Sequence, residues 1–573
     1  MDERAYEILP GNHGTHIKVN ARGRDLLRIP RLNRGSAFTA EQRRRLGLTG
    51  LLPAHSTPLE GQLHRTYQRF RAAGNPLQQF AYLRGLRDRN TVLFYRLVSE
   101  HLAEMMPIIY TPTIGEAIQE FSLMFRHVHG VFLDIDSPED MDVALRSTGR
   151  NADDVDIVIV TDSEGILGIG DQGVGGVEIC LGKKSLYTAA AGVDPNRMVP
   201  IVLDVGTDNL RLLNDDLYLG LRQARVRGER YDEFIELFVS KVQEVFPHAM
   251  IHWEDFGASN AHRILATYRD KVCTFNDDVQ GTAAVVAGAV LAAVRAKGER
   301  LSAQRVVVHG AGTAGIGVAD LLVDLMVAEG GITPEQARER FWATSSRGLV
   351  TDAPGSRFRD FQQPYARPHQ EVADWALDDD GIIDLAEVVN NVKPTVLIGT
   401  SGQPGAFTED IITDMAAHTE RPIIMPLSNP TALVEATPAH LLEWTGGRAY
   451  LATGSPFEPV THDGVEYTIA QVNNAFVFPG LGLGVSVCKA SRVTDGMIGA
   501  AAQALASLVR ISRPGQSLLP ALNDLRRVSA TVAIAVAKAA ADEGVAEEPL
   551  TNPVQQVFDA MWQPVYPELI IED

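Results

Sequence analysis

Four carboxylates lie at the ends of two strand-like segments that follow each other closely along the chain. Glu254 and Asp255 end the first segment, and Asp277 and Asp278 end the second. Carboxylates this close together repel and raise one another's pKa values unless a metal ion or a basic residue compensates their charge. One acidic pair in a chain with 72 acidic residues would indicate solvated surface. Two pairs at successive strand ends indicate a site for Mg²⁺ or Mn²⁺.

Three glycines downstream, Gly310, Gly312 and Gly315, form the pattern G-x-G-x-x-G. The pattern alone is weak, because glycines also serve tight turns and close packing. Here it follows the apolar run 306–308 and precedes a helix-like segment, and this placement favours a dinucleotide bound at the start of the helix. A metal ion and a dinucleotide are therefore expected to serve one reaction.

The composition excludes several classes of function. The charges sum to −20 over 573 residues, which argues against nucleic acid or an anionic membrane surface as a partner. The three cysteines show no C-x-x-C spacing, which fits a reducing cytoplasm and leaves no thiolate zinc motif. Residues 1–4 lack the features of a signal peptide. The longest apolar run, 283–294, is too short to span a bilayer, so we expect a buried helix there.

The order of the expected elements indicates an α/β protein with a Rossmann-type dinucleotide-binding domain, a second α/β catalytic domain and an N-terminal helical domain. Apolar residues recur at helical spacing from Leu77 to Met106, whereas β-branched strands alternate with amphipathic helices from Asp156 onward. Residues 354–369, rich in Pro, Arg and Gln, are expected to form an irregular loop. The domains are expected at 1–128 (helical), 129–276 (catalytic, first part), 277–473 (NAD(P)-binding) and 474–573 (return to the catalytic domain and a C-terminal helical extension).

Motifs spread over most of the chain resemble the malic enzyme family. The matching segments are Gly47–Pro53, Asp88–Asn90, Tyr110–Thr113, Gly168–Asp171, Trp253–Phe256, Cys273–Thr282, Ser428–Thr431, Gly454–Phe457 and Asn473–Gly480. The resemblance implies oxidative decarboxylation of L-malate to pyruvate and CO₂, with reduction of NAD or NADP and dependence on a divalent metal. It also implies a homodimer or homotetramer.

The resemblance also implies the acid, base and metal positions of the site. Glu254, Asp255 and Asp278 match the family's metal ligands. Lys183 matches the general base, and Asp277 matches the acid beside it that helps set its protonation. A lysine is a poor base unless its pKa is lowered, so burial and the nearby metal are needed for this role. Because most lysines in proteins are exposed, we expect one of Lys183 and its neighbour Lys184 to lie on a solvated turn.

Three further positions complete the set that the resemblance implies. Tyr110 matches the general acid that protonates the enolate left by CO₂ loss, although by itself it could equally be a packed aromatic residue before a turn. Asn429 and Asn474 match residues that hold substrate and nicotinamide through their side-chain amides.

Two positions depart from the family's pattern. Gly165 stands where many malic enzymes carry an arginine, so a bidentate clamp for a carboxylate is missing. A glycine at this position resembles both bacterial malic enzymes and the related malolactic enzymes, which convert L-malate to L-lactate and CO₂ while retaining NAD. After the strand that follows the glycine-motif helix, Ser345 and Arg347 stand where an acid would usually bind the ribose of NAD. The loss of the acid makes NADP use plausible and leaves the cofactor choice open.

Three hypotheses follow from the sequence. A malic enzyme leads because of the breadth of the match, and a malolactic enzyme is the alternative compatible with Gly165. A catalytically silent metabolite-binding protein is the third. The intact set of acidic, basic and aromatic site residues argues against it.

Overall fold

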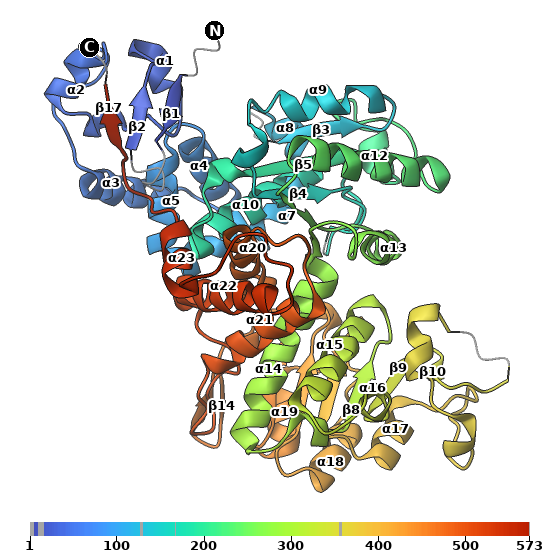
Figure 1. Cartoon of the computed structure of the whole chain (residues 1–573). Helices are drawn as coiled ribbons and strands as arrows, with labels where there is room; N and C mark the ends of the chain where they lie inside the picture. The colour runs from blue at the N-terminus through green and yellow to red at the C-terminus, as the bar shows by residue number, and fades with distance from the viewer. Residues whose placement is uncertain (1–4, 10–15, 127–129, 167, 355–357, 572–573) are drawn as a thin grey trace.

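Two large sheets of mainly parallel strands dominate the computed structural model, which describes residues 5–9, 16–126, 130–166, 168–354 and 358–571 (Figure 1). Residues 1–4, the boundary expected at 128/129 and residues 355–357 of the expected loop lie outside the described residues. Helix α14 (Thr282–Lys297) follows the first sheet along the chain, and in Figure 1 it runs beside the second sheet. The four-part division of the chain stays a prediction.

The first sheet has five parallel strands, and its order sets the geometry of the site. The order is β3 (Val131–Asp134), β5 (Met198–Asp204), β4 (Ile157–Thr161), β6 (Met250–Trp253) and β7 (Thr274–Asn276). Helix α10 (Val177–Ala191) packs on β4 and β5, and α12 (Glu229–Val245) buries its apolar residues in the core formed with these strands. The alternation of β-branched strands and amphipathic helices produces the expected α/β layers.

The second sheet has the strand order of a doubly wound dinucleotide-binding fold. The order is β10 (Gly348–Leu349), β9 (Phe341–Ser345), β8 (Val306–His309), β11 (Val396–Gly399), β12 (Ile423–Pro426), β13 (Tyr450–Thr453) and β16 (Ala470–Gln471). The chain runs outward from β8 in one direction to β10 and then returns to β11 on the other side. Ligands of such sheets bind at the carboxyl ends of the strands beside this switch point.

The first hundred described residues are mostly helical, as expected. The main helices are α3 (Leu59–Ala72), α4 (Pro76–Arg87), α5 (Thr91–Glu100), α6 (Leu102–Ile109) and α7 (Thr113–Gln119). Asn90 begins α5 by accepting a hydrogen bond from the Leu93 backbone N–H, at 2.9 Å. A small sheet was not expected: β2 (His16–Val19) lies between β1 (Tyr6–Ile8) and β17 (Glu568–Ile570). The C-terminal extension, expected to be helical, therefore ends in a strand.

Helix α14 is buried over most of its length. Residues 283–294 are all buried, and the helix packs against α15 (Thr313–Glu329) and α21 (Asp495–Ser507). Within the described residues, the segment Asp277–Lys297 is the one helix long and apolar enough to cross a membrane, but 83% of its apolar window is buried inside the protein. Its apolar character therefore serves the core. The other C-terminal helices include α20 (Phe478–Cys488) and α22 (Leu525–Asp542), which pack on each other.

Candidate active site

The two acidic pairs meet because β6 and β7 are parallel neighbours. Trp253 lies opposite Asn276 in the register of these strands, so the residues that follow each strand leave the sheet at the same edge. One carboxylate oxygen from each of Glu254, Asp255 and Asp278 lies within 4.8 Å of the others. The structure therefore brings together all three of the expected metal ligands.

The backbone holds Asp255 in a rare conformation. Its φ is +53°, in the left-handed region that aspartate tolerates better than most residues. Its N–H donates to Asp278 Oδ2 at 2.9 Å. Asp277 and Asp278 begin a short π-helical turn, Asp277–Gly281, a distortion that is frequent at functional sites.

The three carboxyl groups are electrostatically suited to a divalent cation. Burial, together with neighbouring carboxylates, raises the pKa of Glu254 to about 7 and that of Asp278 to about 8. The pKa of Asp255 is raised well above its ordinary value by burial and then by Asp278. Asp255 Oδ1 is buried and has no hydrogen-bond partner. Three hard oxygen donors, one of them unpaired, fit Mg²⁺ or Mn²⁺.

Lys183 lies beside the carboxylates in the fully buried interior. Helix α10 carries it, and its Nζ donates to Asp277 Oδ2 and lies 3.0 Å from Glu254 Oε1. Burial lowers the pKa of Lys183, but Asp277 and Glu254 raise it more, so the net shift is well above the ordinary value. A general base needs a lysine pKa below the ordinary value, whereas the two neighbouring carboxylates keep the pKa of Lys183 above it. Lys184 is not on a solvated turn: its Nζ donates to Met198 O at 3.3 Å.

Tyr110 and Asn474 complete the cluster around Lys183. Tyr110 follows α6, is buried, and has its ring centre 5.1 Å from Lys183 Nζ. Burial raises the pKa of Tyr110 well above its ordinary value. The amide of Asn474 donates to both the backbone oxygen and Oδ2 of Asp277, each at 3.2 Å.

Asn429 lies apart from this cluster. It follows β12, and Ser455 Oγ donates to its Oδ1 at 2.6 Å, while its own amide donates to Leu427 O at 3.4 Å. No hydrogen bond found within the described ranges joins it to Asp277 or Lys183.

The glycine motif opens a separate cavity of about 510 Å³ at the carboxyl end of β8. Gly310 has φ +110°, and a Cβ there would lie 2.4 Å from the Thr400 carbonyl carbon. A Cβ on Gly315 would lie 2.3 Å from Gly310 O. The expected residues Gly310, Gly312, Ser345 and Arg347 line the cavity, and Gly315 supports its turn. Arg359 and Gln362, which sequence reasoning missed, line it too.

The loop that carries the expected metal ligands Glu254 and Asp255 contacts the backbone of Gly165 and leaves no room there for a side chain. Its N–H donates to Asp255 O at 2.9 Å, and a Cβ there would lie 2.7 Å from Phe256 O. No side chain, and hence no arginine, fits at position 165 with this backbone.

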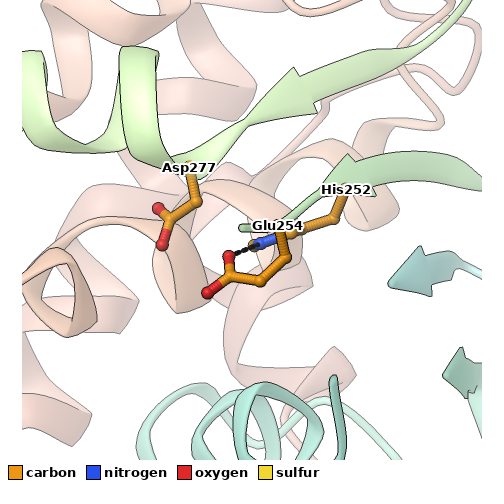
Figure 2. Close-up of side chains that lie close together, drawn as sticks. All are labelled: His252, Glu254 and Asp277. Atoms are coloured by element: carbon orange, nitrogen blue, oxygen red, sulfur yellow. Dashed lines mark hydrogen bonds and ion pairs between the residues drawn. The ribbon is translucent and has the colours of Figure 1, made fainter. Parts of the chain in front are cut away.

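Two buried residues beside Glu254 were not anticipated. His252 lies on β6, and Glu254 follows the strand two residues later, at the spacing that places two side chains on one face of a strand. Figure 2 shows its imidazole directed at Glu254, with Asp277 nearby; the Nε2 to Oε2 distance is 3.1 Å. The Tyr187 hydroxyl lies 2.8 Å from His252 Nδ1. The period-two spacing of His252 and Glu254 is the one signal that could have revealed this pairing.

Comparisons with known proteins agree over nearly the whole chain. Residues 87–269 match the family model of the malic enzyme N-terminal domain, and residues 279–541 match that of the malic enzyme NAD binding domain. The chain is 52% identical over 551 residues to NAD-dependent malic enzyme 3 of Bacillus subtilis, covering 96% of this chain and 97% of that protein. It is 47% identical over 549 residues to the NAD-dependent malic enzyme of Acinetobacter baylyi, covering 95% and 96%.

Solved structures share the fold. The malic enzyme of Entamoeba histolytica has a TM-score of 0.54 at 22% identity, covering 90% of this chain and 89% of that one. The malic enzyme of Pyrococcus horikoshii has a TM-score of 0.54 at 23% identity, covering 80% and 89%.

Proposed function

Because this chain belongs to the malic enzyme family, we propose that it catalyses the oxidative decarboxylation of L-malate to pyruvate and CO₂ with NAD as hydride acceptor. The observation that carries the proposal is the buried cluster in which Lys183, Tyr110 and Asn474 surround the acids at the ends of β6 and β7. Relatives similar over their full length are NAD-dependent malic enzymes, so the malolactic alternative is not favoured.

Glu254, Asp255 and Asp278 are the proposed ligands of a Mg²⁺ or Mn²⁺ ion. The unpaired, buried Oδ1 of Asp255 and the raised pKa values of all three groups support this assignment. A divalent ion bound there would polarise the hydroxyl group of malate and later the ketone, while NAD accepts the hydride.

Lys183 is the proposed base for the malate hydroxyl, and Asp277 is its proton partner. As an ammonium group, Lys183 must first release a proton; its Nζ contacts Asp277 and Glu254, and a divalent cation bound to Glu254 would offset one of the two charges that raise the lysine pKa. Asp277 is the proposed acceptor of that proton, and its Oδ1 is buried without a hydrogen-bond partner. The neutral amine then takes the hydroxyl proton as hydride leaves the carbon.

Tyr110 is the proposed acid for the enolate. Its raised pKa keeps the phenol protonated at neutral pH, so it has a proton to give. The phenolate that remains is stabilised by the neighbouring Lys183, whose charge acts to lower the tyrosine pKa. Protonation of the enolate at carbon yields pyruvate.

The amides and the glycine motif are the proposed binding groups. Asn474 would orient substrate beside Asp277, which its amide already contacts, and Asn429 would hold the nicotinamide. Gly310 and Gly312 would hold the pyrophosphate at the start of α15. Ser345 and Arg347 would meet the ribose, where the missing acid leaves room for the 2′-phosphate of NADP as a second cofactor.

A homodimer or homotetramer is proposed from an exposed apolar patch near α8 (Phe121–Met124) and α11 (Leu210–Leu213). The exposed apolar side chains of these segments are Leu123, Phe125, Leu210, Leu217 and Leu219; Leu123 and Leu217 line one hollow, and the Leu219 N–H donates to Ser122 Oγ. Apolar patches of this kind mark protein interfaces. A cytoplasmic location is proposed too, which the three free cysteines support.

The test is an assay of the purified protein with malate, Mn²⁺ and NAD, in which reduced cofactor, pyruvate and lactate are measured. Stoichiometric NADH and pyruvate are expected, and lactate without net NADH would refute the proposal. Asp255→Ala should abolish turnover with the fold intact. Asp270→Ala, at an exposed turn after α13 (Ala258–Tyr268), is the matched control and should not.

A further inference from the structure

Glu254 is held on both of its oxygens before any ion binds. Oε1 lies 3.0 Å from Lys183 Nζ, and Oε2 lies 3.1 Å from His252 Nε2. A carboxylate that binds a cation is ionised, and an ionised carboxylate accepts hydrogen bonds and cannot donate them. In the metal-binding state of Glu254 the hydrogen of this contact therefore belongs to His252 Nε2.

The imidazole of His252 is held in one orientation. The hydroxyl of Tyr187, on α10 one turn beyond Lys183, lies 2.8 Å from Nδ1. Three aromatic rings meet the imidazole edge-on, those of Tyr187, Phe275 and Phe478, with centroid distances of 5.7, 5.5 and 5.7 Å. His252 and Tyr187 are fully buried. The ring is thus packed so that Nε2 is directed at Glu254.

We propose that His252 is a positioning residue that donates Nε2–H to Glu254 and holds this carboxylate in the orientation that binds the divalent cation, with Tyr187 fixing the imidazole. The inference rests on the proposed metal role of Glu254. Hydrogen-bond partners of metal-ligating groups orient those groups, and their loss typically weakens metal binding about 10- to 100-fold.

A competing arrangement makes His252 a ligand itself. Ligand atoms of His252, Glu254 and Asp277 lie within 4.8 Å of one another (Figure 2). The ammonium group of Lys183 already contacts both Glu254 and Asp277, however, so a second cation there would meet it at close range. His252 Nε2 would also have to give up its hydrogen. The geometry therefore favours an orienting role over direct ligation.

The test compares two substitutions that remove the ring equally. His252→Gln keeps an N–H donor for Glu254, and His252→Met has similar length without one. Mn²⁺ binding to the purified, chelator-treated proteins is followed by electron paramagnetic resonance, NAD binding by fluorescence, and folding by thermal unfolding. We expect the glutamine variant to bind Mn²⁺ within about threefold of wild type and the methionine variant about 10- to 100-fold more weakly. NAD affinity should be unchanged in both.

Each other outcome overturns the inference. If both variants bind Mn²⁺ equally weakly, His252 acts through packing or as a direct ligand. If both bind Mn²⁺ with wild-type affinity, His252 has no role at the metal. If the methionine variant fails to fold, Tyr187→Phe replaces it, since it keeps every ring and removes the hydroxyl that holds Nδ1. A Mn²⁺ affinity about threefold or more below wild type is then expected, and an unchanged affinity would refute the proposal. If wild type itself binds no Mn²⁺ at a site sensitive to Asp255→Ala, the proposed metal site fails as well.

Discussion

Metal binding to this protein should release protons, because the proposed ligands hold protons that a cation must displace. The pKa of Glu254 is raised to about 7 and that of Asp278 to about 8, and that of Asp255 is raised well above its ordinary value, in each case chiefly by burial. At pH 6 both Glu254 and Asp278 are therefore protonated, so binding should release about two protons from these two groups alone. Over the interval to about pH 8 the apparent Mn²⁺ affinity should rise about 500-fold, about 10-fold from Glu254 and about 50-fold from Asp278.

The sign for stability follows from the same shifts. These carboxyl groups have higher pKa values folded than unfolded, where they titrate near their ordinary values of 4.5 for Glu254 and 3.8 for Asp278. Their contribution to stability is therefore full below about pH 4 and is lost as the pH rises toward about 8, by up to ~1.4 kcal/mol per group and pH unit. Added Mn²⁺ should raise the unfolding temperature most at the alkaline end.

The assay is a calorimetric Mn²⁺ titration at about pH 6, 7 and 8 in two buffers of different ionisation enthalpy, which together give affinity and proton release. Asp270→Ala, an exposed acid outside the site, is the control and should titrate as wild type. An affinity that is equal at the two ends of this range, with no dependence on the buffer, would show that the three carboxylates are already ionised and would refute the reasoning.

Other substitutions test the acid, the base, the ribose pocket and the loop of the metal ligands. Lys183→Ala should lose hydride transfer from malate, and Tyr110→Phe should lose the tautomerisation of enolpyruvate, each by about 10²- to 10⁴-fold in rate. Losses within a few-fold would assign these proton transfers to other groups. Ser345→Asp should raise kcat/KM for NAD relative to NADP, because a carboxylate repels a 2′-phosphate; an unchanged ratio would show that residue 345 does not face the ribose. Gly165→Ala should cost about 1–3 kcal/mol of stability and weaken Mn²⁺ binding, since its methyl group would lie 2.7 Å from Phe256 O. If that variant is as stable as wild type, the loop can shift to make room for the methyl group at no cost.

The features that the sequence predicts are those with a local cause. Strand-like runs that end in acids predicted the position of Glu254 and Asp278, because the carboxyl ends of parallel strands meet at one edge. The glycine motif predicted the cavity at β8 in the same way. Both depend on short segments whose spacing is visible along the chain.

The features that the sequence did not predict depend on distant partners. His252 has a role only because Tyr187, 65 residues earlier, meets its other nitrogen. The net pKa of Lys183 depends on how two carboxylates outweigh burial. That Gly165 must be glycine depends on a carbonyl oxygen in the loop after β6. None of these balances can be read from the spacing of residue types.

The pairing of β17 with β2 constrains the order in which the protein can fold during synthesis. Glu568–Ile570 lie beside His16–Ile17–Lys18 in parallel register, with both chain ends on the same side of the molecule in Figure 1. The small N-terminal sheet therefore cannot be completed until residue 570 has left the ribosome, and until then the edge of β2 is unpaired and open to other strands. Truncation of the chain before residue 568 would therefore remove β17 and leave β2, near the opposite end of the sequence, without one of its two partner strands.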